Sequence, residues 1–250
     1  MKTSGNTVLI TGGSAGIGLE IARALIAQGN EVIITGRSEE RLQQAAAQLG
    51  EVTTIVNDIA KEEAVQTLAQ RMEKDFPALN IVINNAGHAY AYQLNDKAGA
   101  ATKARAEMQT NYFSVLDLNE QLLPLLSRQP EAAIVNVSSI VAFVPGSNIP
   151  TYSDTKAALH SYSQALRFTL AKTTGIKVFD LMPPLVNTEF SKEIGGEHGI
   201  PPQDVATAFV EALANDAYEI RVGGTEQLYQ LFHSDPQAAF AAMNADRIPA

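Results

Sequence analysis

Tyr152 and Lys156 are the two side chains of this sequence best suited to moving a proton. They stand four residues apart in a stretch with helical periodicity, so both project from one face of a helix. A tyrosine with its usual pKa of about 10 is a poor base near neutral pH, whereas a neighbouring ammonium stabilises the phenolate and lowers that pKa. The pair therefore predicts an acid–base group matched to neutral pH, and an ordinary pair on a solvated helix is the alternative when the spacing is taken alone.

A serine at the end of a predicted strand could assist such a group. Ser139 precedes Tyr152 by thirteen residues, and its hydroxyl can donate a hydrogen bond to an oxygen that gains charge during a reaction. Ser138 is the adjacent alternative. Because successive side chains of a strand point to opposite sides, Ser138 is expected to turn away from the side that Ser139 faces.

A glycine-rich loop follows the first predicted strand. Residues Thr11–Gly18 read TGGSAGIG and lead directly into an amphipathic stretch. Free N–H groups and the positive dipole end of a helix attract an anion such as a pyrophosphate, and glycines let the backbone approach it closely. The loop therefore predicts a dinucleotide site, with a plain turn as the alternative. Its spacing is TGxxxGxG in place of GxGxxG, and the absence of a following Lys-Ser/Thr excludes a P-loop nucleotidase.

Short apolar strands alternate with helix-length amphipathic stretches along the chain, and these elements must position the residues above. The expected strands are Asn6–Thr11, Glu31–Thr35, Val52–Asn57, Asn80–Asn84, Ala132–Ser138, Ile176–Leu181 and Tyr218–Val222. The expected helices are Gly16–Gln28, Glu39–Leu49, Lys61–Asp75, Ala101–Ser127, Tyr152–Lys172 and Pro202–Ala214, followed by one or two short helices broken at Asp235-Pro236.

This alternation predicts the fold class α/β, with one Rossmann-like, doubly wound domain over residues 1–250. Strands that are apolar throughout are typical of a sheet covered on both faces, so we expect a mostly parallel seven-stranded sheet with helices on both faces. In such a sheet ligands bind at the carboxyl ends of the strands.

Composition excludes several classes of function. The net charge is −9, so binding to nucleic acid or to anionic lipid is not expected. The sequence has no cysteine, which excludes disulfides, thiolate metal sites and a cysteine nucleophile, and its four histidines show no ligand spacing, so no metal site is expected. With no signal-peptide pattern and no apolar run long enough to span a bilayer, we expect a soluble protein of the cytoplasm.

Taken together, the motifs resemble the short-chain dehydrogenase/reductase family in its branch of about this length. They are TGxxxGxG at Thr11–Gly18, NNAG at Asn84–Gly87 and YxxxK at Tyr152–Lys156, with Ser139 at the family's usual spacing and Asn111 at its fourth catalytic position. The resemblance covers essentially the whole chain in the right order. Within the family, the opening segment and the PEAAIV stretch at Pro130–Val135 resemble the DltE-like oxidoreductases.

The resemblance implies an oxidoreductase that transfers hydride between NADP(H) and a carbonyl or alcohol substrate. Tyr152 would be the general acid/base, because hydride delivery to carbon leaves an alkoxide that must take a proton. Lys156 would lower the pKa of Tyr152 and bind the nicotinamide ribose, and Ser139 would orient the carbonyl. Asn111 would support a proton relay behind Lys156 through the helix backbone and a water.

The family's cofactor-binding positions can be carried over residue by residue. They are Gly12, Ser14, Gly16, Ile17, Gly18, Arg37, Asp58, Ile59, Asn84, Ala86, Gly87, Tyr152, Lys156, Pro183, Val186 and Thr188. The Val186 backbone and the Thr188 hydroxyl would hold the nicotinamide carboxamide. Pro184 stands where the family usually has glycine, which leaves the path of this loop open.

The end of the second predicted strand indicates which cofactor is preferred. An acid there would bond the ribose 2′-hydroxyl of NAD, but this chain has Gly36 followed by Arg37, whose guanidinium can pair with a 2′-phosphate. We therefore expect a preference for NADP(H). NAD(H) remains the alternative, because Ala15 stands where many NADP-binding relatives carry a second basic residue. Asp58 would contact the adenine or, alternatively, cap the helix that begins near Lys61.

Two rival functions share this fold. A nucleotide-sensing regulatory protein without catalysis would usually have lost the tyrosine or lysine of YxxxK, and both are present. A nucleotide-sugar epimerase or dehydratase generally has a larger segment after the position of Thr188. The substrate side is expected to be apolar (Val141, Phe143, Leu185, Phe190), which favours a neutral carbonyl compound, and the long helices at Ala101–Ser127 and after Tyr152 would form a homodimer or homotetramer.

Overall fold

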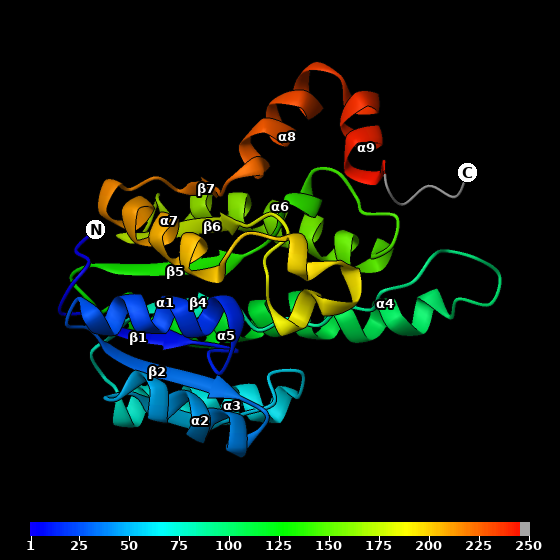
Figure 1. The fold of residues 1–250 in the computed structure, drawn as a ribbon. Coiled ribbons are helices and arrows are strands. Elements are labelled where there is room, and N and C mark those ends of the chain that lie inside the picture. The colour runs from blue at the N-terminus through cyan, green and yellow to red at the C-terminus, as the bar shows by residue number, and fades with distance from the viewer. Residues whose placement is uncertain (246–250) are drawn as a thin grey trace.

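One twisted sheet carries every strand of the computed structural model, which describes residues 1–245; the last five positions of the predicted domain, 246–250, lie outside the described residues. The strands are β1 (Thr7–Ile10), β2 (Glu31–Gly36), β3 (Thr53–Val56), β4 (Leu79–Asn84), β5 (Ala132–Val137), β6 (Ile176–Met182) and β7 (Glu219–Arg221). Their order is β3-β2-β1-β4-β5-β6-β7 and all neighbours pair in parallel (Figure 1). The predicted seven-stranded parallel sheet is confirmed.

Helices cover both faces of the sheet, as expected for strands that are apolar on both sides. The helices α1 (Gly16–Ala27), α2 (Glu39–Leu49) and α7 (Pro202–Asn215) share one buried apolar cluster with β1 and β2. On the other face, α3 (Glu62–Asp75), α5 (Ser114–Leu126) and α6 (Pro150–Leu170) share a second cluster. Between β1 and β4 the strand order reverses direction, and a crevice for ligands opens at such a switch point.

The long helix predicted over Ala101–Ser127 is interrupted. It consists of α4 (Ala100–Met108), a π-helical turn at Gln109–Phe113 and then α5. Thr110 and Ser114 donate their hydroxyls to carbonyls four residues back, at 3.2 and 2.7 Å, which competes with the regular backbone pattern. Wide turns of this kind often mark functional sites, and this one contains Asn111.

Two predicted helix starts also differ from the structure. Helix α6 begins at Pro150, two residues before Tyr152, because proline suits the first turn of a helix. Helix α3 begins after Lys61, which occupies the N-cap position without a side-chain bond, and the Asp58 carboxylate accepts from Ala60 N–H before the helix, so the alternative in which Asp58 caps α3 is wrong. The 3₁₀ turns at Glu189–Ile194 and Gly196–His198 were not predicted, since such short segments carry no periodic pattern.

The C-terminal helices confirm the break at Asp235. Helix α8 (Gly224–Ser234) ends there and α9 (Pro236–Asn244) begins, with the Asp235 carboxylate accepting hydrogen bonds from the backbone N–H groups of Gln237 and Ala238. The two helices form a hairpin that stands apart from the sheet, drawn in orange and red in Figure 1. Among residues 1–245, no helix has the length and apolar character needed to cross a membrane.

Candidate active site

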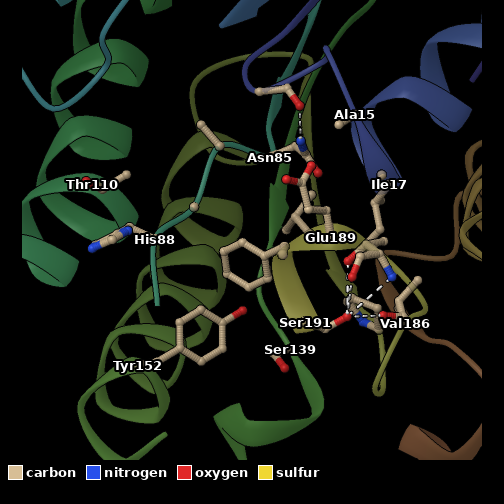
Figure 2. A pocket seen from close by; sticks show the side chains of 18 of the residues that line it. Ala15, Ile17, Asn85, His88, Thr110, Ser139, Tyr152, Val186, Glu189 and Ser191 are labelled. Carbon is tan, nitrogen blue, oxygen red and sulfur yellow. Dashed lines mark hydrogen bonds between the residues drawn. The ribbon is translucent and has the colours of Figure 1, made fainter. Parts of the chain in front are cut away.

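A cavity of about 820 Å³ lies at the carboxyl ends of the strands. It is lined by most of the residues predicted from the sequence, and Figure 2 shows several of them around it. Those that line it are Gly12, Ser14, Gly16, Ile17, Arg37, Asp58, Ile59, Ala86, Gly87, Ser139, Tyr152, Lys156, Pro183, Val186 and Thr188. Three predicted residues, Gly18, Asn84 and Asn111, do not line the cavity.

The glycine loop between β1 and α1 forms one wall, and two of its glycines are required by contact. Gly12 has φ +66°, and a Cβ there would lie 2.9 Å from the Cα of Ala86. A Cβ on Gly18 would lie 2.5 Å from the side-chain nitrogen of Asn85. Gly18 therefore allows the loop and β4 to pack closely, which is a supporting role away from the cavity surface.

The asparagine that bonds to the glycine loop is Asn85, whereas the sequence motif had singled out Asn84 as a cofactor contact. The Asn85 amide donates to the carbonyls of Thr11 and Gly12, both at 3.0 Å. Asn84 is buried on the other side, where its amide donates to Asn119 and Asn136 at 2.9 Å. The expectation that Asn84 contacts a cofactor is therefore not supported by its position: adjacent residues at a strand end face opposite ways.

The far end of the cavity carries charged side chains of both signs. Arg37, from the turn after β2, lines it together with Asp58 and with Arg41 of α2, which sequence reasoning missed although it stands four residues after Arg37. Arg41 pairs with Glu189, which comes from the segment after β6 and lines the cavity too. Both side chains are largely exposed, so this pair contributes little to stability and leaves a cation near the cavity.

Tyr152 and Ser139 face this cavity from α6 and from the end of β5 (Figure 2). The Ser138 hydroxyl donates to the buried carboxylate of Asp180, although Ser138 lines the cavity next to Ser139. Removal of water around the half-buried Tyr152 raises the pKa of its hydroxyl; the carboxylate of Glu107 adds to the rise and the Ser139 hydroxyl opposes it.

Lys156 is buried beside Tyr152, one helical turn along α6. Its ammonium donates to the Val137 carbonyl at 2.7 Å and lies 5.4 Å from the centre of the Tyr152 ring. Burial lowers the pKa of Lys156 to about 8, against the opposing effect of the Asp180 carboxylate. The sequence predicted that Lys156 lowers the pKa of Tyr152. In the structure the pKa of Tyr152 is raised instead, because burial of the hydroxyl and the nearby Glu107 carboxylate both disfavour the phenolate.

Asn111 sits behind this wall. Its side chain accepts from the His88 N–H at 2.7 Å and donates to the His88 carbonyl at 2.8 Å and to the Thr155 hydroxyl at 3.0 Å. The π-helical turn thus directs Asn111 to tie the segment after β4 to α6. This contact positions His88, which lines the cavity, and the helix that carries Tyr152 and Lys156.

The segment after β6, which contains Pro184, forms the remaining wall of the cavity. The Ile140 N–H donates to the Pro183 carbonyl at 2.9 Å. The backbone of Ile200 bonds to the segment twice: its N–H donates to the Leu185 carbonyl at 3.0 Å, and its carbonyl accepts from the Asn187 N–H at 2.8 Å. The Thr188 and Ser191 hydroxyls lie 3.2 Å apart. Further lining residues that the sequence did not single out for this cavity are Asn85, Thr110, Ile140, Ile149, Ser191, Ile194 and Met243.

The residues present fit a dinucleotide. Helix α1 begins without a side-chain cap and without an acid in its first turn, and its first residues, Gly16 and Ile17, line the cavity. Its N–H groups and dipole are thus available to a pyrophosphate. Arg37 suits a ribose phosphate at one end, and Lys156 with Tyr152 suits hydroxyl groups at the other. Such an arrangement at the switch point of a parallel sheet defines a nucleotide-binding oxidoreductase site.

Comparison with known proteins agrees with this class. Residues 6–198 match the family model for short chain dehydrogenases. The chain is 37% identical to the uncharacterized oxidoreductase DltE of Bacillus subtilis, over 98% of each chain. A short chain dehydrogenase from Burkholderia cenocepacia in complex with NADP superimposes over 100% of both chains with a TM-score of 0.86 and 28% identity. One from Burkholderia phymatum in complex with NAD has a TM-score of 0.87 over 95% of this chain and 96% of its own, at 21% identity.

The chain therefore belongs to the short-chain dehydrogenase family and is an oxidoreductase of that family. The family predicted from the sequence motifs is confirmed, and so is the likeness to DltE.

Proposed function

We propose that this protein transfers hydride between NADP(H) and a carbonyl or alcohol substrate. The observation that carries the proposal is one cavity with Ser139, Tyr152 and Lys156 on its wall and Arg37 at its other end. The test is to mix the protein with a panel of ketones, aldehydes and alcohols and to follow the absorbance of the reduced nicotinamide, with NADP(H) and NAD(H) in parallel.

Each residue of the site has a defined task in this reaction. The bound cofactor supplies or accepts the hydride. Tyr152 donates a proton from its hydroxyl to the substrate oxygen during reduction, and the Ser139 hydroxyl donates a hydrogen bond to that oxygen and orients it. Lys156 holds the nicotinamide ribose, and Asn111 positions α6 through Thr155 and supports proton relay behind Lys156.

The remaining predicted residues would hold the cofactor along the cavity. The glycine loop and the start of α1 would bind the pyrophosphate, Asp58 and Ile59 would border the adenine, and Val186 and Thr188 would hold the carboxamide. Support comes from two similar structures, whose complexes contain NADP and NAD respectively. The second of these shares only the fold with this chain, so the NADP preference proposed here is based on Arg37.

Arg37→Asp is expected to reverse the cofactor preference. In the wild type, kcat/KM with NADPH should exceed that with NADH at least about tenfold, which corresponds to ~1.4 kcal/mol from a guanidinium–phosphate contact. In the variant, a carboxylate repels the 2′-phosphate and accepts a bond from the 2′-hydroxyl, so NADH should be favoured. Arg71→Asp, on the exposed side of α3, is the matched control and should keep the wild-type ratio. A wild-type preference for NADH would contradict the role given to Arg37.

The protein is expected to be a homodimer or homotetramer of the cytoplasm. Closed symmetric oligomers are common among such enzymes, and Phe113 at the end of the π-helical turn and Phe168 on α6 leave 50% and 67% of their surface exposed in the single chain. Light scattering after size exclusion should therefore give two or four times 26.7 kDa. A mass of one chain at micromolar concentration would contradict this expectation.

A further inference from the structure

The C-terminal helix α9 reaches the cavity from the opposite end of the sequence. Met243, in the last turn of α9, lines the same cavity as Ser139 and Tyr152. The hairpin of α8 and α9 otherwise stands apart from the sheet (Figure 1). Because α9 projects from the sheet, hydrogen bonds or packing contacts must hold its end in place for Met243 to reach the cavity.

Asn244 provides such hydrogen bonds. It is 0% exposed, and its amide group bonds in both directions: the nitrogen donates to the Pro145 carbonyl at 3.1 Å and the oxygen accepts from the Ser147 N–H at 2.7 Å. The same nitrogen donates to the Phe240 carbonyl within α9 at 2.9 Å. Burial of an amide is unfavourable unless it is hydrogen-bonded, and bonds to a donor and an acceptor of one loop fix the position of the helix end. Asn244 therefore helps to fix where Met243 lies, together with the buried Ala239 of α9 and the packing of Tyr229 on Phe143.

The loop that receives Asn244 belongs to the active site. Residues 143–149 connect the segment after Ser139 to α6, and Ile149, at the end of this loop, lines the cavity. Gly146 N–H donates to the Ser153 hydroxyl at 3.1 Å, next to Tyr152 on α6. One loop thus joins α9 to the helix that carries the proton donor, and it places Met243 at the Ser139–Tyr152 end of the cavity.

The wall at this end is apolar. Besides Met243 it is formed by side chains that carry no charge, namely Ile140, Val141, Ile149, Leu185, Phe190 and Ile194. The charged residues lining the described cavity are Arg37, Arg41 and Asp58 at the far end, Glu189, which pairs with Arg41, and Lys156, which bonds to Val137. The polar groups near this wall are hydroxyls and the His88 imidazole, so a substrate carboxylate would lose its water there without an arginine to pair with. Methionine, in contrast, adapts to irregular apolar surfaces.

We propose that α9 forms the outer wall of the substrate site, with Met243 contacting an apolar group next to the carbonyl of an uncharged substrate and Asn244 as the positioning residue that holds Met243 there. This inference depends on the proposed carbonyl–alcohol chemistry and adds a substrate class and two specificity-determining positions to it.

The test compares reduction of unbranched methyl ketones from 2-butanone to 2-decanone by wild type, Met243→Ala, Met243→Leu and Asn244→Ala. Met243→Ala should lower kcat/KM about tenfold for the longest ketones and less than about threefold for 2-butanone, because one or a few lost carbon contacts change specificity by this order. Met243→Leu should stay near wild type. Asn244→Ala should raise KM for the long ketones about tenfold with kcat changed much less.

The controls separate this role from a general loss of structure. Phe240 lies on the same helix, but its side chain is exposed and does not line the cavity. Phe240→Ala should therefore leave all kinetic constants near wild type. The Kd for NADPH, measured by nicotinamide fluorescence, should be unchanged in every variant. A keto acid of the same chain length should be reduced at least about tenfold less efficiently than its ketone.

The outcomes distinguish this inference from the proposed function. If the wild type reduces the ketones but Met243→Ala and Asn244→Ala show wild-type kinetics along the series, the role of α9 is overturned and the chemistry stands. If keto acids and ketones are reduced equally well, the substrate class is overturned. If the wild type reduces no carbonyl compound with either cofactor, both proposals fail. Should Asn244→Ala not fold, Met243→Ala and Phe240→Ala still decide the result.

Discussion

Replacement of Tyr152 by phenylalanine is expected to lower kcat at least about a hundredfold while the Kd for NADPH stays nearly unchanged. The phenylalanine ring can pack as the tyrosine ring does, so the variant loses only the oxygen that carries the proton. General acid–base catalysis typically contributes ~10²–10⁴-fold, and its loss appears in kcat because the proton is transferred only in the reaction itself. The surroundings that raise the pKa of Tyr152 keep it protonated and ready to donate at neutral pH.

Steady-state reduction of a ketone with NADPH and fluorescence titration of NADPH measure the two quantities separately. Tyr162→Phe is a matched control, because Tyr162 lies on the same helix, does not line the cavity and bonds through its hydroxyl to Asn119 at 3.4 Å. It should keep kcat close to wild type. A Tyr152→Phe protein with more than about a hundredth of wild-type kcat would show that another group donates the proton.

The parts of the fold that the sequence predicted are those with a local signal. Apolar runs and helical periodicity located all seven strands and the main helices, and TGxxxGxG and YxxxK located two walls of the cavity. The NNAG motif located the third wall, on which Asn85 and not Asn84 lines the cavity. Asn84 and Asn85 are chemically identical, and only the direction in which the chain leaves β4 decides that Asn85 meets the glycine loop.

What the sequence missed depends on contacts between distant segments. The π-helical turn at Asn111 forms where the side chain meets His88 and Thr155, and no periodicity within the helix shows those partners. Likewise, α9 was expected as a short helix, but the entry of Met243 into the cavity depends on tertiary contacts, among them the bond of Asn244 to the loop at Pro145 and the packing of Tyr229 on Phe143. The helical pattern thus predicted that α9 forms, while its place at the cavity depends on tertiary packing that the sequence does not show.

The pKa of Tyr152 is the point at which sequence reasoning gave the wrong direction. Lys156, one helical turn away, suggested a lowered pKa for Tyr152, because the sequence shows the nearby positive charge but not the burial of the two side chains. In the structure both groups lose water, and desolvation raises the pKa of the phenol and lowers that of the ammonium. The pKa of Lys156 is thereby lowered to about 8, and we expect the pH dependence of the reaction to follow this group.

Ketone reduction is accordingly expected to slow as the pH rises through about 8, the pKa of Lys156. A lowered pKa means that the ammonium is present below about pH 8 and lost above it, while Tyr152, with its raised pKa, remains protonated throughout. If the charged ammonium holds the ribose, kcat/KM for NADPH must fall on the alkaline side. Lys156→Met should raise the Kd for NADPH at least about tenfold, the effect of losing one hydrogen bond to a charged group worth ~1.5 kcal/mol, and should reduce kcat as well.

Measurement of kcat/KM for NADPH between pH 6 and pH 10, in the wild type and in variants, tests this assignment. Lys156→Arg keeps its charge over the whole range, so the activity that remains in it should show no decline near pH 8. Lys172→Met removes an exposed lysine just beyond α6 and should preserve the wild-type profile. A wild-type profile that is flat to pH 10, or one whose decline persists in Lys156→Arg, would assign the titration to a group other than Lys156. The ammonium would then hold the ribose without controlling the pH dependence.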